Sequence, residues 1–183
     1  MIHIRQLSKC DFQAAIAIKE ACWKSDYKDI VPLEAFSTSK EIGVFADWFL
    51  NPGNDFRLLF GAFFEERLVG FIGAGTAEIE DSTNGVEVNS LFVESEFRRK
   101  GIGTLLIKTA LEPFHELGYE EVVVYNWHDV PSNRFYRHIG GTLFRKVVQY
   151  PAGKALPVDI FRWDLARMQE LLTSICKRRH LTE

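Results

Sequence analysis

The run of cations and glycines at residues 98–103 has the clearest chemical potential in this sequence. It reads Arg98-Arg99-Lys100-Gly101-Ile102-Gly103 and lies between a predicted strand and a predicted helix. Glycine lets a backbone approach a ligand closely, and free N–H groups at a helix start carry partial positive charge. We therefore predict a phosphate-binding turn. The run is neither a P-loop nor Gly-x-Gly-x-x-Gly. A plain strand-to-helix turn with solvated cations is the alternative.

In the predicted strand before this run, the alternation of apolar residues shifts by one position. Val86 and Val88 alternate on one phase, whereas Leu91 and Val93 fall on the other. A β-bulge produces such a one-residue slip and leaves backbone polar groups unpaired for an extended ligand. A strand whose two faces are both partly buried is the alternative.

Composition excludes several function classes. The 183 residues are 46% hydrophobic with a formal net charge of −3, which favours one globular domain over residues 1–183. This charge argues against a nucleic-acid binder, and no apolar run approaches the roughly 20 residues that span a membrane. Cys10, Cys22 and Cys176 are too few and too scattered for a metal site or a disulfide framework. Without an export signal in the first residues, we expect a cytoplasmic protein that uses no metal.

Strands and helices are mixed along the whole chain. Hydrophobic periodicity predicts strands at residues 2–7, 56–64, 68–77, 86–93, 122–125, 143–150 and 157–165. It predicts helices after residue 8, at 33–50, 101–117 and 132–139, and from 166 onward. Residues 51–54 are typical of a turn, Glu65-Glu66 is typical of a hairpin connection, and Pro113 should kink its helix or lie in the last turn. Such a mixture favours an α/β (α+β) fold around one sheet.

Residues 89–103 resemble motif A of the GNAT superfamily of acetyl-CoA-dependent N-acetyltransferases. Arg98, Gly101 and Gly103 match its Arg/Gln-x-x-Gly-x-Gly/Ala signature. Residues 132–141, which include Tyr136, are similar to the family's Phe/Leu-Tyr-Glu-Lys-x-Gly-Phe/Gly segment. The expected order of elements also agrees with the GNAT fold, which is a mixed central sheet flanked by helices. The resemblance covers nearly the whole chain.

This resemblance implies that acetyl-CoA is the co-substrate and binds in an opening between parallel strands at 86–93 and 122–126. Its pantetheine would lie on the backbone near Leu91, Phe92 and Val93. Its pyrophosphate would lie on backbone N–H groups that start at Arg98 or Arg99 and continue through Lys100, Gly101, Ile102, Gly103 and Thr104.

One family contact departs from the pattern. In the superfamily an asparagine seven residues before the tyrosine commonly contacts the cofactor, and Asp129 stands at that place here. Asn126 lies three residues earlier and Asn133 four residues later, and both stay open as alternatives.

The resemblance also implies roles for two side chains in direct acyl transfer. Tyr136 is the expected proton donor to the leaving sulfur, because a phenol with a pKa of about 10 is protonated at neutral pH. Glu87 is the expected general base, acting through water. A packed aromatic and a solvent-facing strand residue are the respective alternatives. The N–H of Phe92 or Val93 would stabilise the oxyanion, and we assign His128 and His138 no role.

Together these inferences predict an acetyltransferase whose acceptor is a primary amine of a small molecule. The N-terminal aromatics Trp23, Tyr27, Phe45 and Trp48 include candidates for the acceptor pocket, and most of them are expected in the core. Related proteins are often dimers, so the resemblance also allows a homodimer. The alternatives are another acyl group, a protein N-terminus as acceptor, and an acyl-CoA sensor without turnover.

Overall fold

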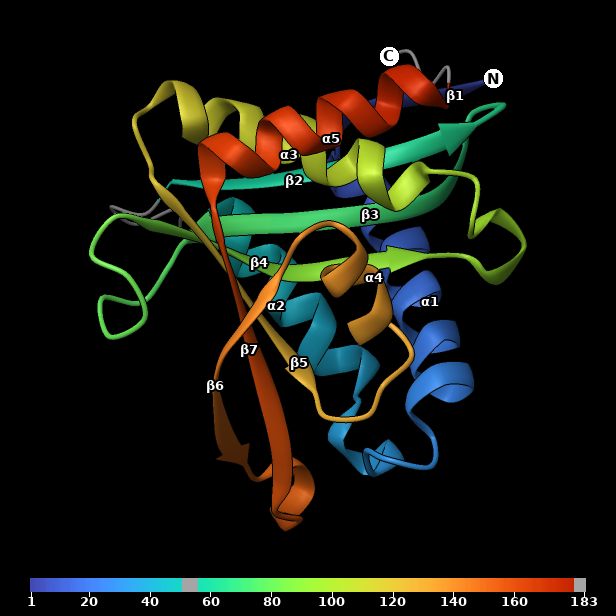
Figure 1. Cartoon of the computed structure of the whole chain (residues 1–183). Helices are drawn as coiled ribbons and strands as arrows, with labels where there is room; N and C mark the ends of the chain where they lie inside the picture. Colours follow the sequence, from blue (N-terminus) through green and yellow to red (C-terminus); the bar gives the residue numbers. More distant parts are fainter. Residues whose placement is uncertain (51–55, 180–183) are drawn as a thin grey trace.

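The computed structural model describes residues 1–50 and 56–179, apart from the side chains of 48–50. The turn predicted at 51–54 and the Trp48 side chain lie outside the described residues. Within them, seven strands form one sheet in the order β1-β2-β3-β4-β5-β7-β6 (Figure 1). The strands are β1 (Ile2–Gln6), β2 (Arg57–Phe64), β3 (Arg67–Thr76), β4 (Gly85–Val93), β5 (Glu121–Trp127), β6 (Thr142–Gln149) and β7 (Leu156–Asp164).

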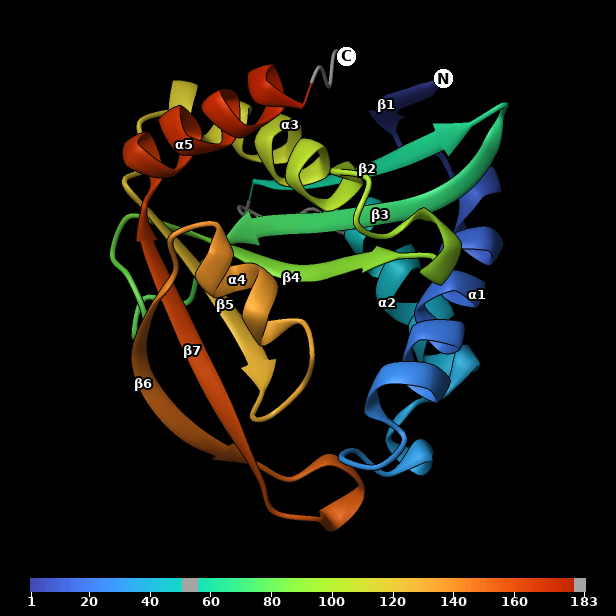
Figure 2. The ribbon, with the colours of Figure 1, turned by 45° about the vertical axis from the view of Figure 1, so that its right-hand side comes forward.

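Helices cover both faces of this sheet. They are α1 (Phe12–Cys22), α2 (Thr38–Leu50), α3 (Ile102–Glu116), α4 (Asn133–His138) and α5 (Leu165–Arg178). The short turns η1 (Lys9–Asp11), η2 (Trp23–Tyr27), η3 (Leu33–Ala35), η4 (Ser95–Phe97) and η5 (Pro151–Gly153) connect them. Figures 1 and 2 show α3 and α5 on one face, with α1 and α2 on the other. The predicted fold class, a mixed sheet flanked by helices, is therefore confirmed.

Two hydrophobic clusters hold the layers together. Val86 and Val88 of β4 belong to the cluster beneath α3 and α5, which also contains Tyr136 of α4. Phe63 and Phe71 belong to the cluster beneath α1 and α2. Because successive residues of a strand point to opposite faces, the side chain of Glu87, between Val86 and Val88, projects toward the face that α1 and α2 cover.

Most of the predicted boundaries agree with the structure, and one helix does not. The stretch 33–50 is not continuous: Phe36 is extended (φ −92°, ψ 132°), which separates η3 from α2. Gly43, a residue type that weakens helices, lies inside α2, and a Cβ added there would have no atom within 4 Å. Pro113 lies in the last turn of α3, one of its two predicted places. Glu65 and Glu66 form the predicted hairpin connection, both with positive φ.

Candidate active site

β4 and β5 form a fork at the centre of the sheet. They are parallel, and they pair only where Gly85–Glu87 meet 121–123. Beyond this point β4 pairs only with β3 and β5 only with β7, and Figure 2 shows the two strands running apart. The predicted pair of central parallel strands is thus present, and their separation leaves backbone edges open to an extended ligand.

A bulge lies on β4 just beyond the fork. Gly73 pairs with Ser90 and Ala74 pairs with Val88, so Asn89 is left without a partner on β3. The Asn89 side chain lies over Gly73. A Cβ added at Gly73 would lie 2.8 Å from Asn89 Oδ1. The phase slip in the sequence therefore coincides with a bulge. The alternative, a strand whose two faces are both partly buried, also holds for residues 90–93.

The chain between β4 and α3 presents a concave row of backbone N–H groups. Arg99 (φ 64°) and Gly101 (φ 87°) both adopt left-handed conformations. The first helical bond runs from Leu105 N to Gly101 O at 3.0 Å. Within the described residues, the N–H groups of residues 99–104 donate to no acceptor, because 102–104 form the first turn of α3. Such a row beside a helix start suits an anionic oxygen.

Arg98 braces this turn instead of facing outward. Its Nε donates to Val93 O at 2.8 Å, and Nη1 donates to Asp26 of η2 at 3.0 Å. Its Nη2 lies 3.2 Å from Cys22 Sγ, and its backbone N–H donates to Ser95 O. Its backbone N–H and each of its three side-chain nitrogens have a partner within the protein, so the free N–H row begins at Arg99.

Tyr136 lies buried on the α3 side of the sheet. Its ring packs against Phe161 and Trp163 of β7, with centroids 5.7 and 6.1 Å away. Burial, and secondarily the nearby Tyr27, raise the pKa of Tyr136 above the usual phenol value. The hydroxyl therefore stays protonated at neutral pH and can donate a proton. Tyr27 itself is hydrogen-bonded to Ser132, directly before α4.

Glu87 projects from the opposite face, at the closed end of the fork. Burial raises the pKa of Glu87 to about 7, and the carboxylates of Asp81 and Glu78 add to the shift. Asp81 is buried, and it accepts hydrogen bonds from the Tyr125 hydroxyl and the Arg145 guanidinium. A carboxylate that titrates near pH 7 is suited to general-base work.

The three candidates for the family's asparagine contact differ in their surroundings. Asp129 has a positive φ (63°) and an 83% exposed side chain, 3.4 Å from His128 Nε2. Asn133 is buried, accepts from Asn126 Nδ2 at 2.6 Å, and donates to Trp127 O at 3.0 Å. The Asn126 and Asn133 amides are hydrogen-bonded to each other, whereas the Asp129 side chain is mostly exposed.

A cavity of about 410 Å³ lies between the N-terminal turns and the end of β5. Trp23 and Trp127 line it together with Tyr150, Glu34 and Lys40. Of the aromatics predicted near an acceptor pocket, Trp23 lines this cavity, whereas Phe45 belongs to the core beneath α1 and α2. A volume of this size is in the range of small-molecule sites.

Sequence reasoning missed two contributors to this region. Asp26 binds Arg98 across 72 residues, and nothing local in the sequence announces that pairing. Asp159 is fully buried beside α4. The sequence does contain a signal for Asp159, because this carboxylate stands between the apolar residues Val158 and Ile160 of a strand. A carboxylate buried there needs polar partners.

The described part of the chain contains no candidate metal centre and no candidate membrane-spanning helix. No group of three or more histidine, cysteine, aspartate or glutamate side chains there could hold a metal ion. None of the helices there is long and apolar enough to cross a membrane.

Comparison with known proteins gives consistent results. The sequence matches the model of the acetyltransferase (GNAT) family over residues 15–141. It is 38% identical to human N-acetyltransferase 8 over 63 residues, which are 33% of this chain and 27% of that protein. The match thus spans about a quarter of that relative.

Solved structures show the same fold. An N-acetyltransferase from Staphylococcus aureus Mu50 has a TM-score of 0.72 at 18% identity, covering 90% of this chain and 99% of that chain. The PaiA N-acetyltransferase from Thermoplasma acidophilum, in complex with coenzyme A, has a TM-score of 0.62 at 22% identity. That alignment covers 87% of this chain and 98% of the other.

Proposed function

The chain belongs to the acetyltransferase (GNAT) family, and on that premise we propose that it transfers the acetyl group of acetyl-CoA to a primary amine of a small molecule. The proposal includes residues 1–183 as one acetyltransferase domain. The observation that carries it is the fork of β4 and β5, which has a free N–H row at one end and a tyrosine and a glutamate on its two faces.

The donor would bind along β4 and the turn that follows. The pantetheine would lie on the open edge of Leu91, Phe92 and Val93, beyond the last pairing with β5. The pyrophosphate would accept hydrogen bonds from the N–H groups of 99–104, with the exposed Arg99 and Lys100 adding positive charge. Asp129 would face the donor from the β5 side.

Transfer would proceed without a covalent enzyme intermediate. The neutral amine nitrogen bonds to the thioester carbonyl carbon, and its proton passes through water to Glu87. The oxyanion that forms accepts a hydrogen bond from the N–H of Phe92 or Val93. The carbon–sulfur bond then breaks, and the leaving sulfur takes the Tyr136 hydroxyl proton.

The acceptor would enter from the face that carries Glu87. Trp127 projects to the same face as Val123 and Tyr125, because side chains two residues apart share a face. The 410 Å³ cavity that Trp127 and Trp23 line is large enough for a small amine. A small molecule is therefore the acceptor that we propose, and a protein N-terminus is the alternative.

The test is release of free thiol from acetyl-CoA in the presence of polyamines, aminoglycosides, aromatic amines, amino acids and short peptides. We expect release with at least one small amine and a lower rate of release in Glu87→Gln at pH 7. Release with peptides alone would favour the protein N-terminus. Coenzyme A binding without release on any acceptor would favour a sensor and contradict the proposed turnover.

Two further parts of the proposal concern assembly and location. We propose a homodimer through β6, an edge strand whose Leu143, Phe144 and Val148 side chains are exposed. Light scattering during gel filtration tests this, and a monomeric mass at micromolar concentration would contradict it. We also propose a cytoplasmic location, which is consistent with the free thiols of Cys10 and Cys22.

A further inference from the structure

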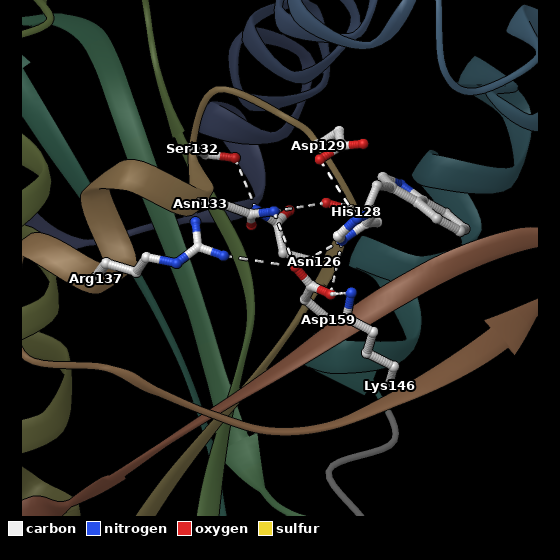
Figure 3. Close-up of polar contacts among 9 residues, drawn as sticks. Asn126, His128, Asp129, Ser132, Asn133, Arg137, Lys146 and Asp159 are labelled. Carbon is white, nitrogen blue, oxygen red and sulfur yellow. Dashed lines mark hydrogen bonds and ion pairs between the residues drawn. The ribbon is translucent and has the colours of Figure 1, made fainter.

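Asp159 lies at the centre of a polar cluster beside α4. It comes from β7, where it pairs with Asn126 of β5 on one side and Lys146 of β6 on the other. Its side chain is 0% exposed. His128 Nδ1 lies 2.9 and 3.0 Å from its two oxygens, and Lys146 Nζ lies 3.8 Å away. Figure 3 shows these side chains converging on the Asp159 carboxylate.

Two of its contacts come from α4 itself. Asn133 Nδ2 lies 3.5 Å and Arg137 Nη2 lies 3.8 Å from Asp159 Oδ2. Residues four apart in a helix lie on the same side, so both reach the same carboxylate. Tyr136 stands between them in the sequence and packs against Phe161, two residues after Asp159 on β7.

This cluster ties α4 to the sheet. A helix of six residues has little stability of its own, so its orientation comes from tertiary contacts. A buried carboxylate is costly unless its partners stay in place. Asn133 is further fixed by Asn126 and by Trp127 O, which ties the start of α4 to β5.

We propose that Asp159 is a positioning residue for acetyl transfer. Through Asn133 and Arg137 it fixes the orientation of α4, and with it the position of the Tyr136 hydroxyl relative to the thioester sulfur. This inference rests on the proposed function, in which Tyr136 is the proton donor. A misplacement of about 1 Å is enough to lower turnover substantially, whereas coenzyme A binds backbone N–H groups at the start of α3, which are not part of α4, so its Kd should be unaffected.

The structure offers a matched pair of variants. Arg137 and Lys146 are both cations 3.8 Å from Asp159, with side chains 53% and 51% exposed, but one is on α4 and the other on β6. Both can be replaced without burying an unpaired group. We expect Arg137→Gln to lower kcat for thiol release by about fivefold or more and Lys146→Gln to leave it unchanged. The acceptor in this assay is the amine that gives the highest rate of thiol release among those tested for the proposed function.

Three readouts separate positioning from a general structural role. Calorimetry with coenzyme A should give the same Kd for both variants and wild type. Hydrogen exchange of the α4 amides should become faster in Arg137→Gln and not in Lys146→Gln. In the Tyr136→Phe background, Arg137→Gln should cause no further loss of kcat, because its effect passes through the tyrosine.

Asp159→Asn extends the test, with an expected kcat loss of tenfold or more at unchanged coenzyme A affinity. If that variant does not fold, the matched pair still decides. Equal kcat losses in Arg137→Gln and Lys146→Gln, or a full Arg137→Gln loss in the Tyr136→Phe background, would overturn the inference alone. Unchanged kcat in Tyr136→Phe itself would remove the proposed role of Tyr136, and this inference with it.

Discussion

The Arg98 guanidinium donates to the Asp26 carboxylate at 3.0 Å, although the two residues lie 72 positions apart. This ion pair ties η2 to the turn that follows β4, and the Arg98 Nε bond to Val93 O ties the same side chain to the end of the strand. The turn is therefore braced by a side chain whose polar groups have partners within the protein.

Replacing Asp26 should weaken donor binding without touching the donor site. In Asp26→Asn the partly buried ion pair is lost, and we expect the Kd for coenzyme A to rise about fivefold, which is roughly 1 kcal/mol. Lys24→Gln is the control, because Lys24 also lies in η2 but forms an exposed ion pair with Glu20 of α1. Calorimetry checks both, and equal affinities in Asp26→Asn and wild type would contradict the bracing role.

Tyr136→Phe should separate chemistry from binding. The substitution removes the hydroxyl but keeps the ring that packs against Phe161 and Trp163, so stability should change little. We expect kcat to fall by 10²-fold or more, the usual scale of a lost general acid, with the Kd for acetyl-CoA within about twofold. Steady-state kinetics at saturating amine measure this. Wild-type turnover would eliminate the tyrosine as donor.

The pH dependence of turnover should report Glu87. Its pKa of about 7 leaves it protonated, and inactive as a base, at lower pH. The rate should therefore fall below about pH 7 in wild type, and this acidic limb should be absent in Glu87→Gln. Asp81→Asn should move the limb to lower pH, because one of the charges that raises the pKa is gone. A variant Glu87→Gln that keeps the wild-type limb would exclude this base.

The raised pKa of Glu87 also makes the stability of the fold depend on pH. The folded pKa of Glu87 lies above its unfolded value of about 4.5, so the folded state holds a proton that the unfolded state loses between these values. Stability from this group is thus present below about pH 4.5 and lost as the pH rises through 7. Glu87→Gln should raise the free energy of unfolding at pH 8 by on the order of 1–3 kcal/mol, with little effect at pH 4. Denaturant unfolding at the two pH values measures the difference, and a destabilised variant at pH 8 would be the opposite result.

The fold was largely predictable because its elements carry strong local signals. The alternation in β4 even reported the bulge, since Val86 and Val88 share the core with α3 and Leu91 and Val93 pack against it after the slip. The break before α2 was not predicted, because helix propensity does not mark the extended conformation of Phe36.

The site was predictable only where a motif marked it, as at Gly101 and Tyr136. The hydrogen bonds of Arg98 to Asp26 and of Asn126 to Asn133 could not be predicted, because only the folded chain brings these side chains together. Asp129 takes the family's asparagine position without its amide, and the sequence offered no way to see that its side chain is open.

Calorimetric titration of coenzyme A into wild type, Gly101→Ala and Gly118→Ala tests the central claim most directly. Both glycines are left-handed, with φ of 87° and 85°, so each alanine adds similar backbone strain, about 1–2 kcal/mol. Only Gly101 belongs to the N–H row that we assign to the pyrophosphate. We predict one saturable site in wild type, an unchanged Kd in Gly118→Ala, and a Kd at least tenfold weaker in Gly101→Ala. No heat of binding in wild type, or equal affinity in all three proteins, would contradict the account.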